Sequence, residues 1–335
     1  MSVTVVGSLN EDVVVTVDRL PGRGETVIGS AVAVLPGGKG ANQAAAAGRL
    51  GTGVHMVGRV GADPAAGRQL AALADARVNV GRVQRTEGTP TGTATIPVEA
   101  DGGENLIVVV PGANAELTPA DVDVESVHRA GVLLLQLETP LDTVRAAAAA
   151  TRGTVVLNPA PSQPLPADLL ARVDVLVPNE HELRQLADAP AGELSPAELA
   201  ELARGLGARS TVVTLGARGA LVVPADGPAH VQGPPPVRPV DTTGAGDCFC
   251  GALSSALDRG ETLADAVRYA VTAAALSTTG AGARGALPDD DEVQALLART
   301  PAATPVGRWV HRAGRGPGAT TAPDTTLTLP TDVRL

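Results

Sequence analysis

The chain has 335 residues, a formal net charge of −10 and an aromatic content of 1%. This length fits one large α/β domain or two small domains, and the scarcity of aromatic side chains predicts a core of Val, Leu, Ile and Ala. The acidic balance argues against general binding to nucleic acid or to a membrane surface. The first residues already have the pattern of a strand, and no apolar run is long enough to span a bilayer, so we expect a cytoplasmic protein.

The two cysteines, Cys248 and Cys250, lie two positions apart on a predicted helix. Their side chains would point to different faces, which is poor geometry for a disulfide between them. We interpret them as small buried apolar groups in a reducing compartment. A metal-binding role is not indicated, because no further Cys or His lies nearby in the sequence.

The first half of the chain contains two β-rich insertions. Apolar and turn residues alternate over 13–36, and two further strands are predicted at 91–96 and 106–110, around a turn at 101–103. The insertions, near 13–36 and 91–111, do not fit an alternation of strands and helices, so we expect a small separate sheet that forms a lid. The other elements predicted here are the strands 3–7 and 54–57 and the helices 41–50 and 67–76.

From about residue 131, strands and helices alternate. The predicted strands are 132–137, 155–157, 173–177 and 211–215, and the predicted helices are 141–150, 180–187 and 196–205. This alternation predicts a mostly parallel sheet covered by helices on both faces, which is a three-layer αβα arrangement. Residues 1–300 would form this domain. Residues 301–335 are rich in Pro, Thr, Gly and Ala without an apolar period, so we expect a mostly disordered tail, with a partner-binding tail as the alternative.

The stretch Val240-Asp241-Thr242-Thr243-Gly244-Ala245-Gly246-Asp247 carries the strongest chemical signal. A β-type run precedes it and an apolar helical pattern follows it, so we predict a turn from a strand into a helix. The first N–H groups of a helix lack partners within the helix, and glycine lets a ligand approach them, which gives a cradle for an anion such as phosphate. Asp247 is then either a first-turn acid that stabilises the helix dipole or a base that takes a proton from the group attacking the phosphate.

Two other glycine-rich runs need a different interpretation. Lys39 lies in Gly37-Gly38-Lys39-Gly40-Ala41-Asn42, which lacks the spacing and the following Ser or Thr of a Walker A loop. The run 280–285 matches Gly-x-Gly-x-x-Gly, but it follows a helical pattern instead of a strand. This context argues against a dinucleotide-binding motif.

Several polar side chains follow predicted strands or lie in glycine loops, namely Asn10, Asp12, Lys39, Asn42 and Glu138. Each of them alone is typical of a turn or a helix cap. Together they offer the mixed donors and acceptors that a polyhydroxylated small molecule needs.

Two further segments have both a structural and a functional interpretation. Asn179 and Glu182 have the spacing of a capping box, and the alternative is that they order water around a metal–nucleotide complex. Residues 214–219 form a strand end with a glycine turn, which is either a plain loop or a backbone clamp on phosphates.

The order of these residues resembles that of the PfkB carbohydrate kinase family, and of its ribokinases in particular. The motifs that carry the resemblance are Asn10-Glu11-Asp12, Gly37-Gly38-Lys39-Gly40-Ala41-Asn42-Gln43, Gln136-Leu137-Glu138, Leu157-Asn158-Pro159-Ala160-Pro161, Asn179-Glu180-His181-Glu182, Thr214-Leu215-Gly216 and Gly244-Ala245-Gly246-Asp247. The resemblance extends over about residues 1–295. It implies a ribokinase-like fold with a β lid that also pairs two subunits into a homodimer.

The resemblance further implies ATP-dependent phosphorylation of D-ribose at O5, with Asp247 as the base. It assigns sugar binding to Asn10, Glu11, Asp12, Gly38, Lys39, Gly40, Ala41, Asn42, Glu138 and Asp247. It assigns the binding of ATP and its Mg²⁺ to Asn179, Glu182, Thr214, Leu215, Gly216, Ala217, Arg218, Gly219, Gly244, Ala245 and Gly246. Phosphoryl transfer depends on positioning and charge neutralisation more than on covalent chemistry, which agrees with these residue types.

The resemblance also implies an activating K⁺, held by Asp241, Thr243, Ser277, Gly280, Gly282 and Ala286. Here Ala286 replaces the usual hydroxyl residue, and Val271 stands where His or Asn often meets the nucleotide. Two alternatives stay open. One is another sugar or nucleoside kinase of the family, although a chain with one Phe, one Tyr and one Trp has little aromatic cover for a base. The other is a non-catalytic sugar-binding protein. Loss of Asp247 or of the glycine cradle would have indicated such a protein, and both are present.

Overall fold

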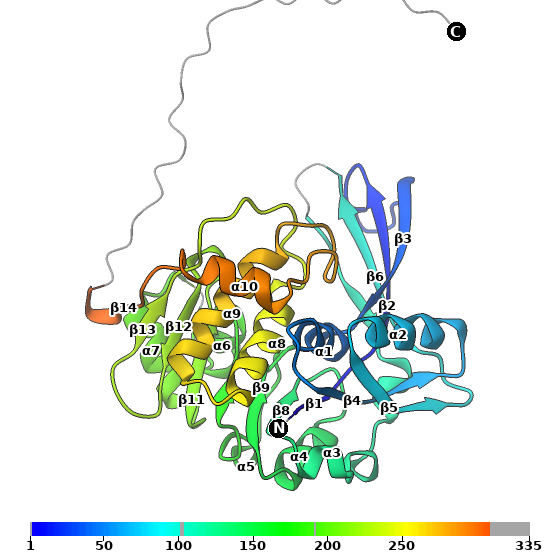
Figure 1. The fold of residues 1–335 in the computed structure, drawn as a ribbon. Helices are drawn as coiled ribbons and strands as arrows, with labels where there is room; N and C mark the ends of the chain where they lie inside the picture. The colour runs from blue at the N-terminus through cyan, green and yellow to red at the C-terminus, as the bar shows by residue number, and fades with distance from the viewer. Residues whose placement is uncertain (1, 101–103, 191, 309–335) are drawn as a thin grey trace, which may run out of the picture.

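Two sheets organise the computed structural model, which describes residues 2–100, 104–190 and 192–308 (Figure 1). The larger sheet has the strand order β14-β13-β12-β11-β10-β9-β8-β1-β4-β5. Its parallel strands are β1 (Val3–Val6), β4 (Val54–Gly61), β5 (Val78–Thr86), β8 (Val132–Leu135), β9 (Thr154–Leu157), β10 (Val175–Leu176) and β11 (Ser210–Thr214). The antiparallel strands at one edge are β12 (Ala220–Val223), β13 (His230–Gln232) and β14 (Thr304–Pro305).

The central strands are short, apolar and buried on both faces, as the sequence predicts. β1 and β8 are completely buried, because helices cover the sheet on either side. β5 was not predicted. It lies at the sheet edge and many of its residues are exposed, so it lacks the continuous apolar run of a central strand.

Helices cover both faces of the large sheet (Figure 1). One layer contains α1 (Lys39–Arg49), α2 (Pro64–Asp75), α8 (Ala245–Asp258), α9 (Leu263–Ser277) and α10 (Asp290–Leu297). The other contains α3 (Glu125–His128), α4 (Leu141–Ala150), α5 (Ala167–Leu170), α6 (Glu180–Leu186) and α7 (Pro196–Gly205). The 3₁₀ helices are η1 (Gly112–Glu116), η2 (Pro119–Val122), η3 (Gly216–Arg218) and η4 (Val306–Arg308). The core is mostly Val, Leu and Ala, and it includes the free, buried thiols of Cys248 and Cys250, as predicted.

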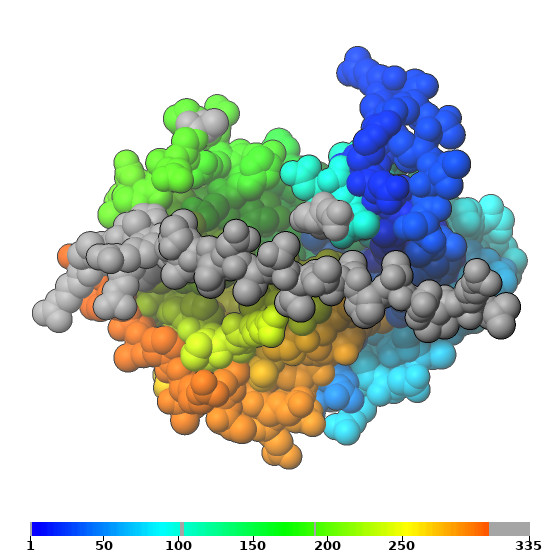
Figure 2. Space-filling view, turned by 90° about the horizontal axis from the view of Figure 1, so that it is seen from above, coloured from blue at the N-terminus to red at the C-terminus, as the bar shows by residue number. Residues whose placement is uncertain are grey.

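The smaller sheet is the predicted lid. It contains β2 (Asn10–Val17), β3 (Gly29–Gly37), β6 (Gly92–Glu99) and β7 (Val108–Val110), in the order β3-β2-β6-β7. β2 pairs antiparallel with β3 and parallel with β6. Figure 2 shows the lid strands β2 and β3, in blue, projecting past the outline of the body. The two β insertions of the sequence therefore form one sheet, although the turn expected at 101–103 lies outside the described residues.

Two expectations need correction. The run before Gly244 is not a strand, because residues 233–240 have no strand pairing. Prolines at 234, 235, 236 and 239 remove backbone donors that a ladder needs. Residues 301–308, expected in the tail, instead add β14 to the sheet, while 309–335 lie outside the described residues. Within the described ranges, no helix is both long and apolar enough to cross a membrane.

Candidate active site

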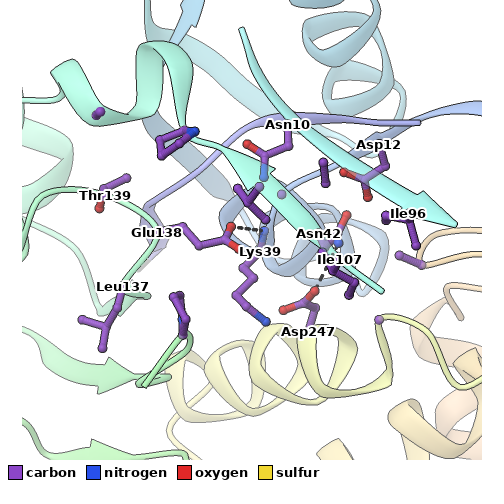
Figure 3. A pocket seen from close by; sticks show the side chains of 18 of the residues that line it. Asn10, Asp12, Lys39, Asn42, Ile96, Ile107, Leu137, Glu138, Thr139 and Asp247 are labelled. Atoms are coloured by element: carbon purple, nitrogen blue, oxygen red, sulfur yellow. Dashed lines mark hydrogen bonds between the residues drawn. The ribbon is translucent and has the colours of Figure 1, made fainter. Parts of the chain in front are cut away.

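The polar side chains predicted to bind a small molecule gather at the carboxyl ends of parallel strands, beneath the lid. Ligands bind at this edge of open α/β sheets. A cavity of about 710 Å³ lies there. The predicted sugar-binding residues that line it are Asn10, Asp12, Gly38, Lys39, Asn42, Glu138 and Asp247 (Figure 3). The lid covers it with Ala94, Ile96, Ile107 and Val109, so we call it the lid cavity.

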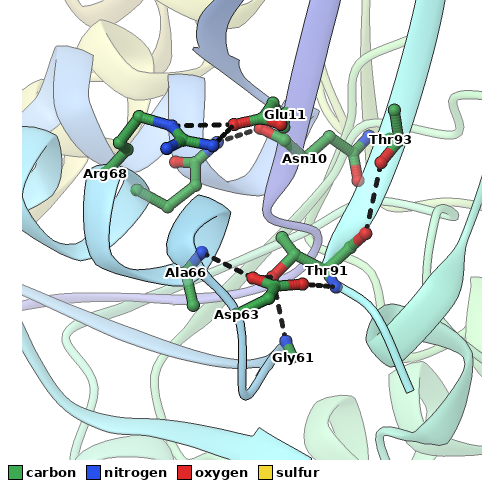
Figure 4. A network of polar contacts seen from close by, with 9 residues as sticks. Asn10, Glu11, Gly61, Asp63, Ala66, Arg68, Thr91 and Thr93 are labelled. Carbon is green, nitrogen blue, oxygen red and sulfur yellow. Dashed lines mark hydrogen bonds and ion pairs between the residues drawn. The ribbon is translucent and has the colours of Figure 1, made fainter. Parts of the chain in front are cut away.

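Three of the predicted sugar-binding residues are not brought to the lid cavity. Glu11 faces α2, where its carboxylate accepts a hydrogen bond from Arg68 Nε at 2.9 Å (Figure 4). Gly40 and Ala41 are buried in the first turns of α1. A Cβ on Gly40 would lie 2.6 Å from the Ser8 nitrogen, so this glycine is required by packing.

The start of α1 is held by side chains from other elements. Gly38 adopts a φ of 86°, and an added Cβ would lie 2.7 Å from the Asn10 nitrogen. The Lys39 N–H donates to Glu138 Oε2 at 3.1 Å, and the Gly40 N–H donates to Ser8 Oγ at 3.2 Å. These contacts satisfy donors that have no partner within the helix. Glu138 therefore anchors α1 as well as lining the cavity.

The Asp12 carboxyl in the lid cavity has a raised pKa. Burial, together with the nearby Glu138 carboxylate, raises the pKa of Asp12 to about 6. For Lys39, burial works to lower the pKa, but the carboxylates of Asp247, Glu138 and Glu182 outweigh it and hold the pKa above its ordinary value. Lys39 thus stays a cation, and Figure 3 shows its side chain pointing toward Asp247.

A second, smaller cavity of about 140 Å³ adjoins the first. We call it the strand cavity, because it is lined by Asn158, Ala160, Val177, Asn179, Glu182, Thr214, Gly246 and Cys250, mostly from loops after strands and from the start of α8. Lys39, Gly244 and Asp247 line both cavities. A ligand in one cavity would therefore meet a ligand in the other at the Asp247 carboxylate.

Asn179 and Glu182 combine the two interpretations that the sequence left open. The Glu182 N–H donates to Asn179 Oδ1, and the Asn179 N–H donates to Glu182 Oε2, each at 2.8 Å. This is the predicted capping box of α6. Burial raises the pKa of Glu182 above its ordinary value, and Glu182 also lines the strand cavity.

The predicted clamp at 214–219 reaches the strand cavity only through Thr214. Leu215 packs into the core around α7, and Arg218 forms an ion pair with Glu180. Gly219 has a φ of 88°, and an added Cβ would lie 2.0 Å from the Gln232 carbonyl oxygen. Gly216 and Ala217 lie in η3, away from both cavities.

The start of α8 has the geometry of an anion cradle. Gly244 adopts a φ of 74°, and α8 has no side-chain cap. An added Cβ on Gly244 would lie 2.7 Å from Ala283, whereas one on Gly246 would meet nothing within 4 Å. The Ala245 N–H donates to the Thr242 carbonyl at 3.2 Å and Ala245 lines neither cavity, so the open part of the helix start, with the positive end of its dipole, lies at Gly246.

Asp247 is held at both carboxylate oxygens. Asn42 Nδ2 donates to Oδ2 at 3.1 Å, and Gln43 Nε2 donates to Oδ1 at 3.0 Å. A carboxylate that only stabilised the dipole of its own helix would not need two amide donors from α1. The contacts therefore favour the second interpretation of Asp247, in which it handles a proton.

The segment predicted to hold a monovalent cation is tied together by Asp241. Its Oδ1 accepts from the Thr243 N–H at 2.8 Å and its Oδ2 accepts from the Gly282 N–H at 2.7 Å. Burial works to raise the pKa of Asp241, but these backbone donors hold it below its ordinary value. Ser277 Oγ donates to the Ala274 carbonyl, and Gly280 packs against Ala286.

Sequence reasoning missed Arg284, which lies behind Asn42. Its Nε donates to Asn42 Oδ1 at 2.8 Å, which orients the Asn42 amide toward Asp247. Burial lowers the pKa of Arg284 to about 10, against the opposing effect of Asp12 and Asp247. The only sequence signal was an arginine inside the glycine-rich run 280–285, for which the sequence argued against a dinucleotide-binding motif and offered no other role for the arginine.

Comparison with known proteins agrees with this geometry. The pfkB family of carbohydrate kinases matches residues 1–290. The chain is 39% identical over 306 residues to a ribokinase from Bacillus subtilis, across 88% of this chain and 99% of that protein. The chain is a carbohydrate kinase of the pfkB family. The family and fold expected from the motifs are thereby confirmed.

Two further relatives of this kinase bear on its ligands. A solved structure of Arabidopsis thaliana ribokinase, complexed with ribose and ATP, has a TM-score of 0.79 and 34% identity, covering 88% of this chain and 98% of that chain. A deoxyribokinase from Salmonella typhi is 34% identical, across 89% of this chain and 99% of that protein. The relatives thus include kinases named for two pentoses.

Proposed function

We propose that this kinase transfers the γ-phosphoryl group of ATP to O5 of D-ribose. The observation that carries the proposal is the meeting of the lid cavity and the strand cavity at Asp247, Gly244 and Lys39. The sugar occupies the lid cavity and the nucleotide phosphates extend into the strand cavity. The ribokinase relatives support ribose as the acceptor.

Asp247 acts as the general base. It accepts the proton of the sugar hydroxyl as that oxygen forms its bond to the γ-phosphorus and the bond to the ADP oxygen breaks. The N–H groups at the start of α8 face the transferring group and stabilise its charge. Lys39 adds a positive charge at the same point, because neighbouring carboxylates keep it protonated.

The residues around the strand cavity fit a magnesium–nucleotide complex. Mg²⁺ is commonly held by substrate phosphates, water and one or two carboxylates. The described residues contain no cluster of three or more His, Cys, Asp or Glu side chains that could hold a metal by itself, whereas Glu182 offers one carboxylate in the cavity. Glu182 and Asn179 would hold the ion through water, and the ion would neutralise phosphate charge.

The residues near Asp241 fit a monovalent cation such as K⁺. Each Asp241 oxygen accepts one N–H and retains a lone pair, and backbone carbonyls of Thr243, Gly280 and Gly282 are nearby in the chain. Ser277 Oγ donates its hydrogen to the Ala274 carbonyl and keeps its lone pairs for a cation, whereas Ala286 has no side-chain oxygen. The ion would balance the Asp241 charge and steady the loop before Gly244. Turnover should therefore fall when K⁺ is exchanged for tetramethylammonium at constant ionic strength.

The lid also carries a surface suited to a second copy of this chain. Apart from Ile107 and Val109, which line the lid cavity, its exposed apolar side chains are Val32, Val34, Leu35, Leu106, Val108 and Val110. Such a patch on a small sheet is a typical interaction site. We propose that two lids pair to form a homodimer, and Val108→Lys should convert a dimer to a monomer in analytical ultracentrifugation. A monomeric wild-type chain at micromolar concentration would contradict this proposal.

A sugar panel coupled to ADP release tests the acceptor. We expect kcat/KM to be highest for D-ribose and about tenfold or more lower for 2-deoxy-D-ribose, because the deoxy sugar leaves buried polar groups of the lid cavity without a partner. NMR of the product should place the phosphate on O5. A higher kcat/KM for deoxyribose, a hexose or a nucleoside would replace ribose as the acceptor. Sugar binding without turnover would indicate a non-catalytic protein.

A further inference from the structure

A chain of amide side chains, two of them fully buried and one half-buried, runs behind Asp247. Gln136 Nε2 donates to Gln43 Oε1 at 2.6 Å. Gln43 Nε2 in turn donates to Asp247 Oδ1 at 3.0 Å and to Asn158 Oδ1 at 3.1 Å. Gln43 and Gln136 are both 0% exposed, and neither lines the lid cavity or the strand cavity. We call Gln136, Gln43 and Asn158 the amide chain.

The backbone fixes the direction of the amide chain. Asn158 Nδ2 donates to the Val177 carbonyl at 2.9 Å, and a carbonyl oxygen can only accept. Asn158 must therefore turn its Oδ1 to Gln43, and the Asp247 carboxylate also needs a donor there. Gln43 meets both needs only by presenting Nε2, which leaves Oε1 for a donor from Gln136.

Gln136 is confined in the orientation that supplies this donor. A Cβ on Gly7 would lie 1.9 Å from Gln136 Oε1, so the glycine makes room for the amide. Among the described residues, Oε1 is buried without a hydrogen-bond partner, whereas Nε2 contacts Gln43. A buried amide that leaves one oxygen unpaired is unfavourable by itself. This orientation of Gln136 is explained if the hydrogen bond from its Nε2 to Gln43 has a function.

We propose that Gln43 and Gln136 are positioning residues for the base, an inference that rests on the proposed phosphoryl transfer. Gln43 holds Asp247 Oδ1 while Asn42 holds Oδ2, so the carboxylate cannot rotate freely about its Cβ–Cγ bond. Gln136 acts through Gln43. Its donor keeps the Gln43 amide from turning its oxygen toward Asp247, where two oxygens would repel each other.

Reversing the polarity of the amide chain tests this inference. Gln136→Glu replaces the donor by an acceptor, so the Gln43 amide turns its Nε2 away from Asp247 and its oxygen toward it. Gln136→Met removes the donor without reversing the direction. We expect kcat of Gln136→Glu to be about tenfold to a hundredfold below that of Gln136→Met. KM for the sugar and for ATP should stay within about threefold of wild type, because ground-state binding is retained.

A matched control separates this effect from the general consequence of a buried carboxylate. Gln232 on β13 is also buried, and its Nε2 donates only to the carbonyls of Gly233 and Pro301, outside both cavities. Gln232→Glu should lower the melting temperature with kcat near wild type. Equal kcat for Gln136→Glu and Gln136→Met, or a kcat loss of the same size in Gln232→Glu, would overturn the proposal.

Gln43→Met keeps the inference testable where Gln136→Glu does not fold. It removes the donor to Asp247 Oδ1 without adding charge. We expect kcat to fall about tenfold while sugar affinity, measured by calorimetry, is unchanged. Adding Gln136→Met to this variant should cause no further loss. Wild-type kcat in Gln43→Met, or additive losses in the double variant, would show that the amide chain does not act on the base.

All variants are assayed with the sugar that the wild-type chain phosphorylates fastest. If that sugar is not ribose, the proposed acceptor fails, but the comparison of variants still decides the role of the amide chain. If ribose is the best acceptor and the variants behave alike, only the amide-chain proposal fails.

Discussion

Helices α1 and α8 both begin after a glycine, but their first backbone N–H groups have different partners. Gly38 precedes α1 and Gly244 precedes α8, both with positive φ, and neither supplies a side-chain cap. At α1 the first N–H groups bind the protein itself, through Glu138 and Ser8. At α8 the Ala245 N–H donates to the Thr242 carbonyl, and the residues beside it, Gly244, Gly246 and Asp247, line the cavities.

The difference shows that a glycine loop before a helix does not identify an anion site by itself. The Glu138 carboxylate occupies at α1 the place that a bound anion would take at α8. Helix α1 is thereby left to present side chains, namely Lys39, Asn42 and Gln43, whereas α8 presents its backbone.

The largest effect is expected at the reactive carboxylate of α8. Asp247→Asn removes the carboxylate that we propose as the base but keeps the size of the side chain, so kcat should fall by about 10²–10⁴-fold. Sugar affinity measured by calorimetry should change much less. Steady-state turnover of the purified variant checks this, and a variant that keeps more than about a tenth of wild-type kcat would show that Asp247 is not the base.

Filling the open N-terminus of α8 should affect catalysis without affecting the fold. Gly246→Ala introduces a Cβ that meets nothing within 4 Å, so the protein should remain as stable as wild type. Because the Cβ occupies space for the phosphates, we expect kcat/KM for ATP to fall about tenfold to a hundredfold. Gly67→Ala, in an equally open position on α2, is the matched control and should leave kinetics unchanged.

The corresponding substitution at the start of α1, Gly40→Ala, should lower the stability of the fold. A Cβ on Gly40 would lie 2.6 Å from the Ser8 nitrogen, so Gly40→Ala should destabilise the fold by about 1–3 kcal/mol. Chemical denaturation measures this loss. We assign the glycine at the start of α1 to packing and the glycine at the start of α8 to ligand binding. A stable Gly40→Ala variant together with an unstable Gly246→Ala variant would contradict this assignment.

The smallest effect concerns Asp12 and pH. Its raised pKa, about 6, means that the folded chain holds this proton more tightly than the unfolded chain. Asp12 therefore favours folding at low pH, and this contribution is lost as pH rises from about 4 to about 6. Asp12→Asn should stabilise the sugar-free protein by about 2 kcal/mol at pH 7.5 and by less at pH 4.5. Equal gains at the two pH values would contradict the raised pKa.

The parts that the sequence could predict are those with a local signature. Alternating residues predicted the lid strands, and glycines with an acid at the start of an apolar helix predicted the cradle. Asn10, Asp12 and Glu138 were found because polar residues after parallel strands share one edge of the sheet.

The parts that could not be predicted depend on long-range contacts or on a competing local rule. The hydrogen bond from Arg284 to Asn42 spans 242 positions, and that from Gln136 to Gln43 spans 93. No periodicity connects such pairs, and each residue alone resembles an ordinary polar residue. The strand predicted before Gly244 was wrong for a local reason: its prolines have no backbone N–H to donate to a neighbouring strand. Glu11 followed the motif but faced α2, since successive residues of a strand point to opposite sides.

The cover of the lid cavity comes from other elements than its reactive groups. Ala94, Ile96, Ile107 and Val109 belong to or adjoin the lid strands β6 and β7, whereas Asp247 and the open N–H groups belong to α8. Substitutions in β6 and β7 can therefore reshape the lid cavity while the proposed proton acceptor and the proposed phosphate cradle stay intact. Evolution could thus change the preferred sugar of this scaffold without rebuilding its catalytic machinery, which accords with the different pentoses for which its relatives are named.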